Sequence, residues 1–352
     1  KSQFNPDFDI EQIVFSNTTV WNQNTLRQEY LARTSTSGND TIIGFQNTND
    51  TLQGGLGNDT LYGLSGSDTY LYNLGDGDDD IQEEFDQSTT ATDRLMLGAG
   101  ITAAGIILER TTTDTDDMTL RFAGQAGSVL LNEQFANRGV EQVIFNDNTT
   151  WNAATLQQEY LTRASTSGND TIVAFNNSAD TIIGGQGNDT MFGLGGADTY
   201  IYNTGDGTDT ITDLGSPSDV DILQLGSGIT SHNVWLQRST TDVEDVTLRF
   251  HNAQGSILFD EQLLGNNTMG IDRIQFAGGE VWNRSEIFMG TSAANTINGG
   301  SENTKVFAGA GVDTIHGNGG NDMLYGDADG DIIYGDDGND MLVGGTGSDT
   351  LY

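Results

Sequence analysis

The chain of 352 residues contains no cysteine, only two prolines, and 13 Lys and Arg residues against 51 Asp and Glu. Without cysteine, neither a disulfide nor a thiolate metal site can form. The formal net charge of −38 makes duplex nucleic acid and anionic membranes poor partners, because both would repel such a surface. There is no apolar run of about 18 residues, so the sequence predicts no membrane span.

The residues that are abundant point to an ordered chain that needs a cation. Low hydrophobicity with high net charge can indicate disorder, but the 15 Phe, 10 Tyr and 4 Trp residues argue against it. Like charges oppose compaction unless cations neutralise them. In a chain without disulfides, a bound metal ion is the obvious alternative cross-link that stabilises the fold.

Internal repeats organise the chain at two lengths. A stretch at 10–42 recurs at 140–172, about 130 residues later, and begins again at Ile271. One tryptophan holds the same place in each copy: Trp21, Trp151 and Trp282. We expect these rings to be core anchors, with sugar stacking as the alternative.

The shorter period is nine residues, as in GGLGNDTLY at 54–62, and it runs without a gap through 299–352. We number each repeat so that aspartate is position six; Asn295 and Thr304 are the exceptions. Position eight is apolar in every repeat: Ile42, Leu52, Leu61, Tyr70, Ile81, Ile172, Ile182, Met191, Tyr200, Ile211, Ile297, Val306, Ile315, Leu324, Ile333, Leu342 and Leu351.

This spacing predicts a coil that binds calcium. Six turn residues precede three strand residues, and the turn glycines permit positive φ and close backbone approach. Two repeats complete one flattened coil, so repeats n and n+2 stack about 4.8 Å apart, with position eight inward. Stacked turns gather aspartates and backbone carbonyls. Six or more oxygens in flexible geometry suit Ca²⁺ better than Mg²⁺.

The distribution of cationic residues supports bound ions. Residues 34–82 and 164–212 contain no Lys or Arg, and 299–352 contains only Lys305, beside Thr304. Protein side chains therefore do not neutralise these carboxylates. The alternative is a metal-free acidic solenoid. We also consider that Lys305 stands in for a missing ion.

The nonapeptide resembles the GGxGxDxUx signature of the RTX (repeats-in-toxin) family, over about half of the chain. The resemblance implies that position-six carboxylates and turn carbonyls coordinate roughly eight calcium ions between alternate turns. The implied carboxylate ligands are Asp40, Asp59, Asp68, Asp79, Asp170, Asp189, Asp198, Asp209, Asp313, Asp322, Asp331, Asp340 and Asp349. The implied turn glycines are Gly57, Gly66, Gly77, Gly187, Gly196, Gly207, Gly311, Gly320, Gly338 and Gly347. Asp50 and Asp180 follow turns without glycine and are left out.

The segments between repeat blocks resemble the haemolysin-type calcium-binding-related module, for example in YLYNLGDGDDDI, DRLMLGAGI and VEQVIFNDNTTW. GIILER, MTLRFA and SVLLNE indicate antiparallel strands, and AATLQQEYLTR from Ala153 indicates a short amphipathic helix. The predicted fold is all-β, with right-handed parallel β-rolls separated by small antiparallel modules that carry a short helix. The predicted boundaries are a truncated module at 1–33, rolls at 34–82, 164–212 and 291–352, and flanking modules at 83–163 and 213–290.

No HExxH helix, GxSxG elbow or Walker loop is present, so the sequence does not indicate an enzyme. His232, His251 and His316 are isolated in the sequence and are expected at the surface. The resemblance implies a segment of a large secreted toxin, adhesin or exoenzyme, exported unfolded by the type I secretion machinery and folded by extracellular calcium.

Two functions remain open at this stage. The first is a structural segment that supports secretion. The second is a calcium-dependent adhesion module that binds a surface glycan or protein, which would place the chain at the cell surface. Ice binding by threonine ranks is disfavoured, because position three varies among Leu, Ser, Gln and Gly.

Overall fold

The structure is a computed structural model that describes residues 12–83, 91–216, 218–251, 255–263 and 270–352. The predicted module at 1–33 therefore lies partly outside the described residues. The chain divides into two compact units, residues 1–163 and 164–352, which we treat in turn.

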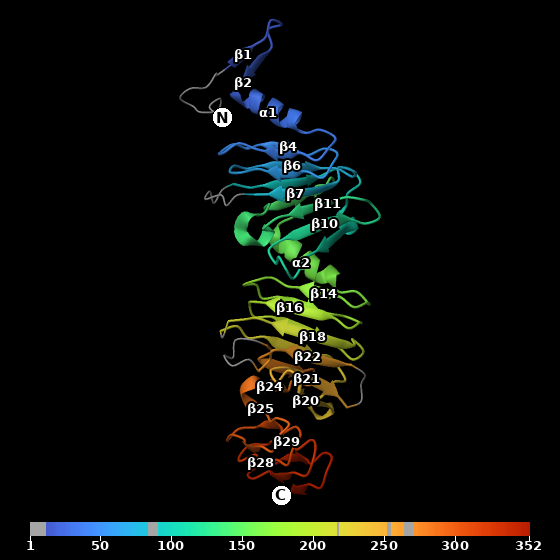
Figure 1. The fold of residues 1–352 in the computed structure, drawn as a ribbon, viewed down its shortest axis with the longest axis vertical. Helices are drawn as coiled ribbons and strands as arrows, with labels where there is room; N and C mark the ends of the chain where they lie inside the picture. Colours follow the sequence, from blue (N-terminus) through green and yellow to red (C-terminus); the bar gives the residue numbers. More distant parts are fainter. Residues whose placement is uncertain (1–11, 84–90, 217, 252–254, 264–269) are drawn as a thin grey trace. The chain divides into compact units, whose positions relative to one another are not determined.

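Unit 1 begins with a hairpin and a helix, followed by the first roll (Figure 1). The roll strands are three to five residues long, as expected for a nine-residue repeat with a six-residue turn. The elements are β1 (Gln12–Val14), β2 (Val20–Asn22), α1 (Gln23–Thr34), β3 (Thr41–Ile43), β4 (Thr51–Gln53), β5 (Thr60–Tyr62), β6 (Thr69–Tyr72) and β7 (Asp78–Gln82).

Alternate strands pair in parallel, which confirms that two repeats make one coil. Strand β3 pairs with β5 with Ile42 opposite Leu61, and β5 pairs with β7 with Leu61 opposite Ile81. Every position-eight side chain is buried except Leu342, which is half-buried, and Leu351, which is 46% exposed. Both exceptions lie in the last two repeats of the third roll, where no further described coil packs on them.

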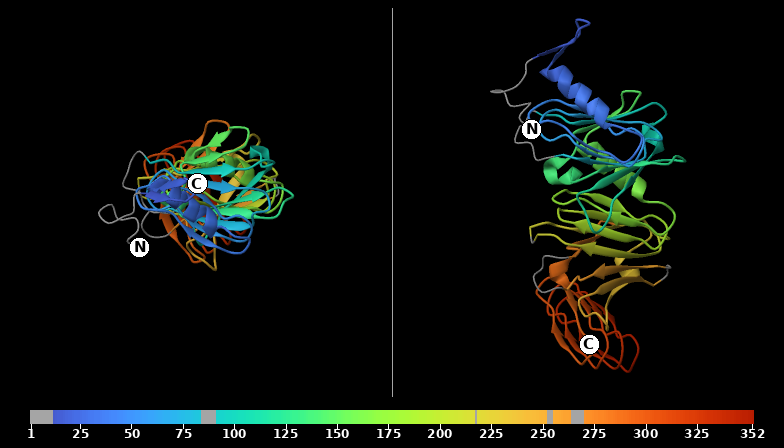
Figure 2. Two further views of the ribbon diagram at one scale, coloured as in Figure 1. Left: turned by 90° about the horizontal axis from the view of Figure 1, so that it is seen from above. Right: turned by 45° about the horizontal axis from the view of Figure 1, so that its top comes forward.

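Helix α1 covers the first coil of this roll, and both ribbon views show it lying across the blue strands (Figure 2). Asn22 caps it, because its Oδ1 accepts the Thr25 amide at 2.8 Å and so satisfies one free N–H of the first turn. Tyr30 meets Phe45 edge-on, with ring centroids 5.8 Å apart. The helix thus protects apolar residues that an uncovered coil would expose.

The flanking module of unit 1 continues the sheets of the roll. Strands β9, β10 and β11 are antiparallel, as predicted. However, β11 also pairs in parallel with β7, and β8 and β12 extend the β4–β6 sheet in parallel. The elements are β8 (Arg94–Leu97), β9 (Ile106–Glu109), β10 (Met118–Phe122), β11 (Ser128–Leu131), β12 (Gln142–Ile144), β13 (Thr150–Trp151) and the predicted helix, α2 (Ala153–Ala164).

Unit 2 repeats this plan and adds the third roll. Its first two sheets run β14-β16-β18-β22-β21-β20 and β15-β17-β19-β23-β24, and the roll has sheets β25-β27-β29-β31 and β26-β28-β30-β32. The strands are β14 (Thr171–Val173), β15 (Thr181–Ile183), β16 (Thr190–Leu194), β17 (Thr199–Tyr202), β18 (Thr208–Asp213), β19 (Ile222–Leu225), β20 (Val234–Arg238), β21 (Val246–Phe250), β22 (Ser256–Asp260), β23 (Arg273–Phe276), β24 (Val281–Asn283), β25 (Ile287–Met289), β26 (Thr296–Asn298), β27 (Lys305–Phe307), β28 (Thr314–His316), β29 (Met323–Tyr325), β30 (Ile332–Tyr334), β31 (Met341–Val343) and β32 (Thr350–Leu351).

The repeated tryptophans pack against phenylalanines. Ring centroids lie 4.9 Å apart for Phe15 and Trp21, and 4.8 Å apart for Phe145 and Trp151. Trp151 is 4% exposed and Trp282 is fully buried, which confirms both as core anchors, whereas Trp21 is only half-buried. Neither Trp151 nor Trp282 is open to solvent for a sugar to stack on.

Candidate calcium sites

The position-six aspartates form ladders along the roll edges. In each rung, Oδ1 of one aspartate accepts the backbone N–H of the position-six residue in the neighbouring coil. Asp59 accepts from Asp40 at 2.7 Å, and Asp79 accepts from Asp59 at 3.0 Å. In the third roll, Asp331 accepts from Asp313 at 2.8 Å. One carboxylate oxygen is thus committed to the backbone, and the other is left over.

That second oxygen, Oδ2, is buried without a hydrogen-bond partner in several ladder aspartates: Asp59, Asp189, Asp198, Asp313, Asp322 and Asp331. Each of these residues is at most 1% exposed. A buried carboxylate oxygen without a partner costs several kcal/mol when it is ionised, on the order of 3–5. Such a group needs a proton or a bound cation.

The glycine at position one makes room for that cation. A Cβ on Gly317 would lie 2.3 Å from Oδ2 of Asp322 and 2.6 Å from the carbonyl oxygen of Gly335. We call the space in front of a position-one glycine a cradle, and the same cradle recurs one repeat later at Gly326, facing Asp331. The oxygen atoms around it belong to a carboxylate and a backbone carbonyl, which are hard ligands of the kind that Ca²⁺ binds.

Sequence reasoning missed these position-one carbonyls and named the position-four glycines instead. The missed signal was the glycine at position one of the regular repeats, as in Gly54, Gly184 and Gly344.

The predicted position-four glycines all lie at positive φ. Because they have no side chain, neighbouring coils can stack closely on them. A Cβ on Gly207 would lie 1.6 Å from the carbonyl oxygen of Gly187 in the coil beside it. The carbonyl of Gly207 itself accepts hydrogen bonds from the Tyr202 hydroxyl at 2.7 Å and the Ser256 amide at 3.1 Å. Coordination of calcium by this set of glycines stays a prediction.

In ladder aspartates whose turns lack glycine, the second carboxylate oxygen accepts a hydrogen bond from the protein backbone. Oδ2 of Asp50 accepts from the Phe45 amide at 2.6 Å, and that of Asp180 accepts from the Phe175 amide at 2.8 Å. These bonds agree with leaving both aspartates out of the ligand set. Asp40 and Asp170, which we predicted as ligands, receive similar bonds from the amides of Thr36 and Thr166.

The remaining predicted carboxylates occupy ladder rungs. Oδ1 of Asp68, Asp79, Asp209, Asp340 and Asp349 each accepts a backbone amide of the neighbouring coil. Calcium coordination by these residues stays a prediction.

Lys305 is buried, and its Nζ lies 2.8 Å from Oε2 of Glu286. Its Nζ donates to Glu286 and to the carbonyl oxygen of Asn303, while Oδ2 of Asp322 is still without a hydrogen-bond partner. The structure therefore gives Lys305 an ion-pair partner outside the ladder.

Burial makes these carboxylates hold protons when no cation is bound. Desolvation, together with repulsion from neighbouring aspartates, raises the pKa of Asp79 to about 7 and that of Asp209 to about 6. Burial also raises the pKa of Asp322 and Asp331. The ladder is therefore a set of sites where protons and metal ions compete.

The ladder also continues into the modules, which sequence reasoning did not foresee. Asp93 accepts the Asp68 amide at 2.6 Å, and Asp221 accepts the Asp198 amide at 2.8 Å. Beyond them, the side chains of Glu141 and Asp272 accept the amides of Asp93 and Asp221. The available signal was an acidic residue two places before a buried apolar one, as in Asp93 and Leu95.

The small space in front of Gly317 predicts that a larger residue there lowers the stability of the third roll. Gly317→Ala is expected to destabilise the third roll in calcium by at least about 2 kcal/mol, because its methyl group would overlap the space shared by Asp322 and Gly335. Gly300→Ala is the matched control, since the nearest atom to its Cβ is 3.8 Å away. Thermal unfolding in 2 mM calcium measures both. Equal stability of the two variants would contradict the cradle.

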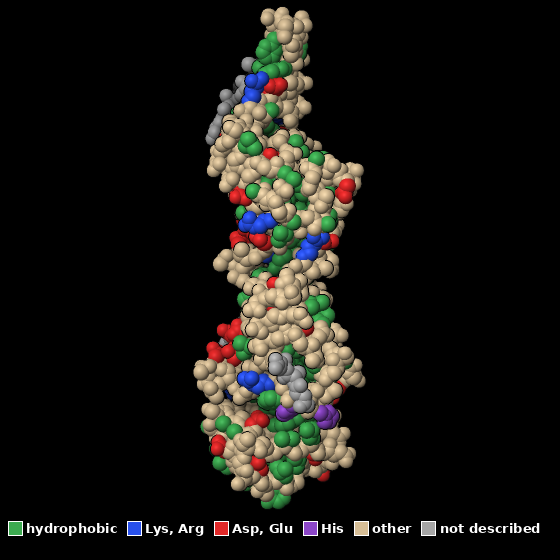
Figure 3. All heavy atoms as spheres, turned by 90° about the vertical axis from the view of Figure 1, so that its right-hand side faces the viewer, with side chains coloured by type: hydrophobic (Ala, Val, Ile, Leu, Met, Phe, Trp, Pro, Cys, Tyr) green, Lys and Arg blue, Asp and Glu red, His purple; other side chains and the backbone are tan. Residues whose placement is uncertain are grey.

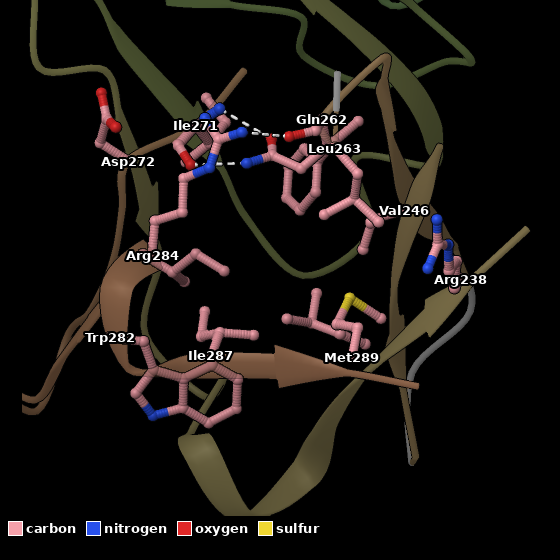
Figure 4. Close-up of a pocket in the computed structure, with 13 residues that line it drawn as sticks. Arg238, Val246, Gln262, Leu263, Ile271, Asp272, Trp282, Arg284, Ile287 and Met289 are labelled. Carbon is pink, nitrogen blue, oxygen red and sulfur yellow. Dashed lines mark hydrogen bonds between the residues drawn. The ribbon is translucent and has the colours of Figure 1, made fainter. Parts of the chain in front are cut away.

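Unit 2 also contains an apolar pocket of about 280 Å³, lined in part by Leu236, Phe259, Trp282, Ile287 and Met289 (Figure 4). In unit 1 the helix α2 follows β13, whereas in unit 2 only a single 3₁₀ turn (Arg284–Glu286) follows β24. The lining also includes Arg238, Asp272 and Arg284, and one carboxylate beside two cationic side chains makes a poor calcium site.

The surface agrees with the composition. In the face shown in Figure 3, backbone and small polar side chains dominate, and Lys and Arg appear only at separate places. Among the residues that the structure describes, no helix has the length and apolar character to cross a membrane.

Stacked parallel strands, glycine turns and oxygen-only cradles define a parallel β-roll built to hold calcium. A family model for the RTX calcium-binding nonapeptide repeat matches residues 46–81, 165–200, 176–211, 289–324, 299–333 and 316–351. In these blocks the chain carries RTX calcium-binding nonapeptide repeats. The haemolysin-type related module predicted between the blocks stays a prediction.

Two further comparisons add little. A search of curated proteins found no match. A search of solved structures found similarity to the extracellular lipase LipA from Serratia marcescens, with 17% sequence identity and a TM-score of 0.20. The match covers 68% of this chain and 38% of the lipase, so the chain spans well under half the length of that protein.

Proposed function

We propose that this chain is a calcium-folded structural segment of a secreted bacterial protein. It leaves the cell unfolded, with type I secretion machinery as the exporter, and becomes rigid when extracellular calcium fills the roll edges. The observation that carries the proposal is the row of buried Oδ2 atoms without hydrogen-bond partners. The proposed role involves no catalysis.

The expected calcium-binding free energy is large enough to fold the chain outside the cell and too small to fold it inside. Extracellular calcium modules have Kd values of about 10⁻⁴ to 10⁻³ M. With Kd about 0.1 mM, about 2 mM calcium stabilises the fold by about 1.8 kcal/mol per site, and roughly eight sites give about 14 kcal/mol. This equals the whole stability of an ordinary domain. At sub-micromolar calcium the same contribution is close to zero.

Neutralising ladder aspartates in both rows of the third roll tests whether their charge imposes the calcium dependence. In Asp313→Asn, Asp322→Asn and Asp331→Asn combined, each Asn keeps the oxygen that accepts the backbone amide. The chain already carries one neutral residue at position six, Asn295, whose backbone N–H donates to Oδ1 of Asp313 at 2.6 Å. The variant is expected to keep the third roll ordered in EDTA at pH 7.5 and to gain less stability from calcium.

Amide hydrogen exchange of residues 305–343 is the measurement, because it reports on this roll alone. The control combines Glu302→Gln, Asp336→Asn and Asp337→Asn, which remove the same charge from exposed side chains of that roll. If the control protects the roll in EDTA as well as the ladder variant does, net charge and not the ladder governs folding, and the proposal fails.

A further inference from the structure

Two triads of carboxylates each combine one repeat aspartate with two acidic residues from outside the nonapeptide pattern. Asp198, Asp213 and Asp221 each place one carboxylate oxygen within 4.8 Å of the others, and their exposed fractions are 0%, 0% and 3%. In unit 1, Asp68, Glu83 and Asp93 make the same arrangement. Neither triad was predicted as a unit, because only Asp68 and Asp198 belong to repeats.

Each triad lies where the last coil of a roll meets the first strand of its module. Asp198 precedes β17, Asp213 ends β18, and Asp221 precedes β19, which pairs in parallel with β17. Asp213 follows the inward Ile211 by two residues and so takes position one of the next turn. In regular repeats this position is glycine, so a carboxylate side chain replaces that small residue here.

The triad of unit 2 has buried oxygens with no hydrogen-bond partner. Oδ1 of Asp213 and Oδ2 of Asp198 both lack one, whereas Oδ2 of Asp213 accepts the Tyr200 hydroxyl at 2.6 Å. The charged groups that act on Asp213 are Asp198, Asp221 and Asp272, all of them acidic. Among the residues that the structure describes, repulsion from these acidic groups acts on Asp213 without an offsetting cationic side chain.

A small cradle opens onto these oxygens. A Cβ on Gly193 would lie 2.5 Å from Oδ2 of Asp213, 2.8 Å from Oδ2 of Asp198 and 2.1 Å from the Tyr200 hydroxyl oxygen. In unit 1, Gly63 faces the matching atoms of Tyr70, Glu83 and Asp68. The two copies use residues of different length, Glu83 and Asp213, yet both place a carboxylate at the cradle.

We propose that each triad binds one divalent cation, calcium in the extracellular medium, and that this ion joins the flanking module to its roll. Two oxygens bound to one Ca²⁺ at 2.3–2.6 Å lie at most about 5.2 Å apart, which the triads satisfy. Three carboxylates give a higher ligand charge than a ladder cradle built partly of carbonyls, so these sites bind calcium more tightly than the ladder does. The inference deepens the proposed function and relies on it for the identity of the ion.

Ion counting tests the triads. Equilibrium dialysis of the full chain at low micromolar calcium is expected to retain two ions, since only the tightest sites fill. Asp213→Asn should lose one, and Glu83→Gln combined with Asp213→Asn should lose both. Asp242→Asn, which changes an exposed carboxylate of the same module, should lose none. Two retained ions in the double variant would overturn the proposal.

A second measurement does not depend on altering a ligand. Terbium at two equivalents should occupy the triads and emit after excitation of the adjacent tyrosines. Tyr70→Phe combined with Tyr200→Phe should reduce this emission several-fold while two terbium ions stay bound. Unchanged emission would place the ions elsewhere and contradict the proposal.

The ladder variant separates this inference from the proposed function. With Asp313, Asp322 and Asp331 changed to Asn, the two tight ions should remain. If the parent chain folds with calcium but binds no tight ions, the triads are held by protons and only the present inference fails. If calcium has no effect on folding while two tight ions bind, the proposed function fails and the triads stand.

Discussion

Removing calcium at pH 7.5 is expected to unfold most of the chain. The buried ladder carboxylates then ionise without a partner, and repulsion among the 51 acidic residues is no longer offset. The expected loss in the free energy of unfolding is about 14 kcal/mol for roughly eight sites, which is comparable with the whole stability of an ordinary domain. Far-UV circular dichroism in EDTA should show little β structure, and 5 mM calcium chloride should restore it.

Magnesium is the control for this effect. At 5 mM it should restore much less β structure, because Mg²⁺ demands a tight octahedron and gives up its water reluctantly, whereas the cradles offer carbonyl and carboxylate oxygens in irregular geometry. A full β spectrum in EDTA at pH 7.5 would show that the coils hold without divalent ions.

Acid is expected to replace calcium in part. Burial raises the pKa of Asp213 to about 8, that of Asp79 to about 7 and that of Asp221 to about 6, above the value of about 4 for an unfolded aspartate. The folded chain therefore holds more protons than the unfolded chain between about pH 4 and pH 8. Its stability in EDTA must then fall as the pH rises through that window.

The measurement is thermal unfolding in EDTA at pH 5.0 and at pH 7.5. The chain should be folded at the lower pH and largely unfolded at the higher one. In 5 mM calcium the dependence should weaken or reverse, because protons compete with the ion for the same oxygens. Greater stability at pH 7.5 than at pH 5.0 in EDTA would mean that these carboxylates are not desolvated as the structure indicates.

The repeat blocks were predictable because a nine-residue period fixes strand spacing, inward side chains and the stacking of alternate repeats. Ile42, Leu61 and Ile81 were placed correctly from position eight alone. The helix at Ala153 and the antiparallel strands of the first module followed from their own periodicity in the same way.

Features that depend on contacts between distant segments were not predictable. The parallel pairing of β11 with β7 joins residues about 50 positions apart, and no local pattern encodes it. Asp198 and Asp221 come together because β17 and β19 pair, and they are 23 residues apart in the sequence, so no local ligand motif marks them. The position-one carbonyls were missed because a glycine signals freedom of the backbone and not the direction of its oxygen.

A crystal structure of the chain grown in calcium, with anomalous differences measured at a wavelength where calcium scatters anomalously, tests the central claim most directly. Peaks are expected between coils of each roll, beside Oδ2 of Asp59, Asp189 and Asp322. Ordered coils with no anomalous density at these oxygens would contradict the account.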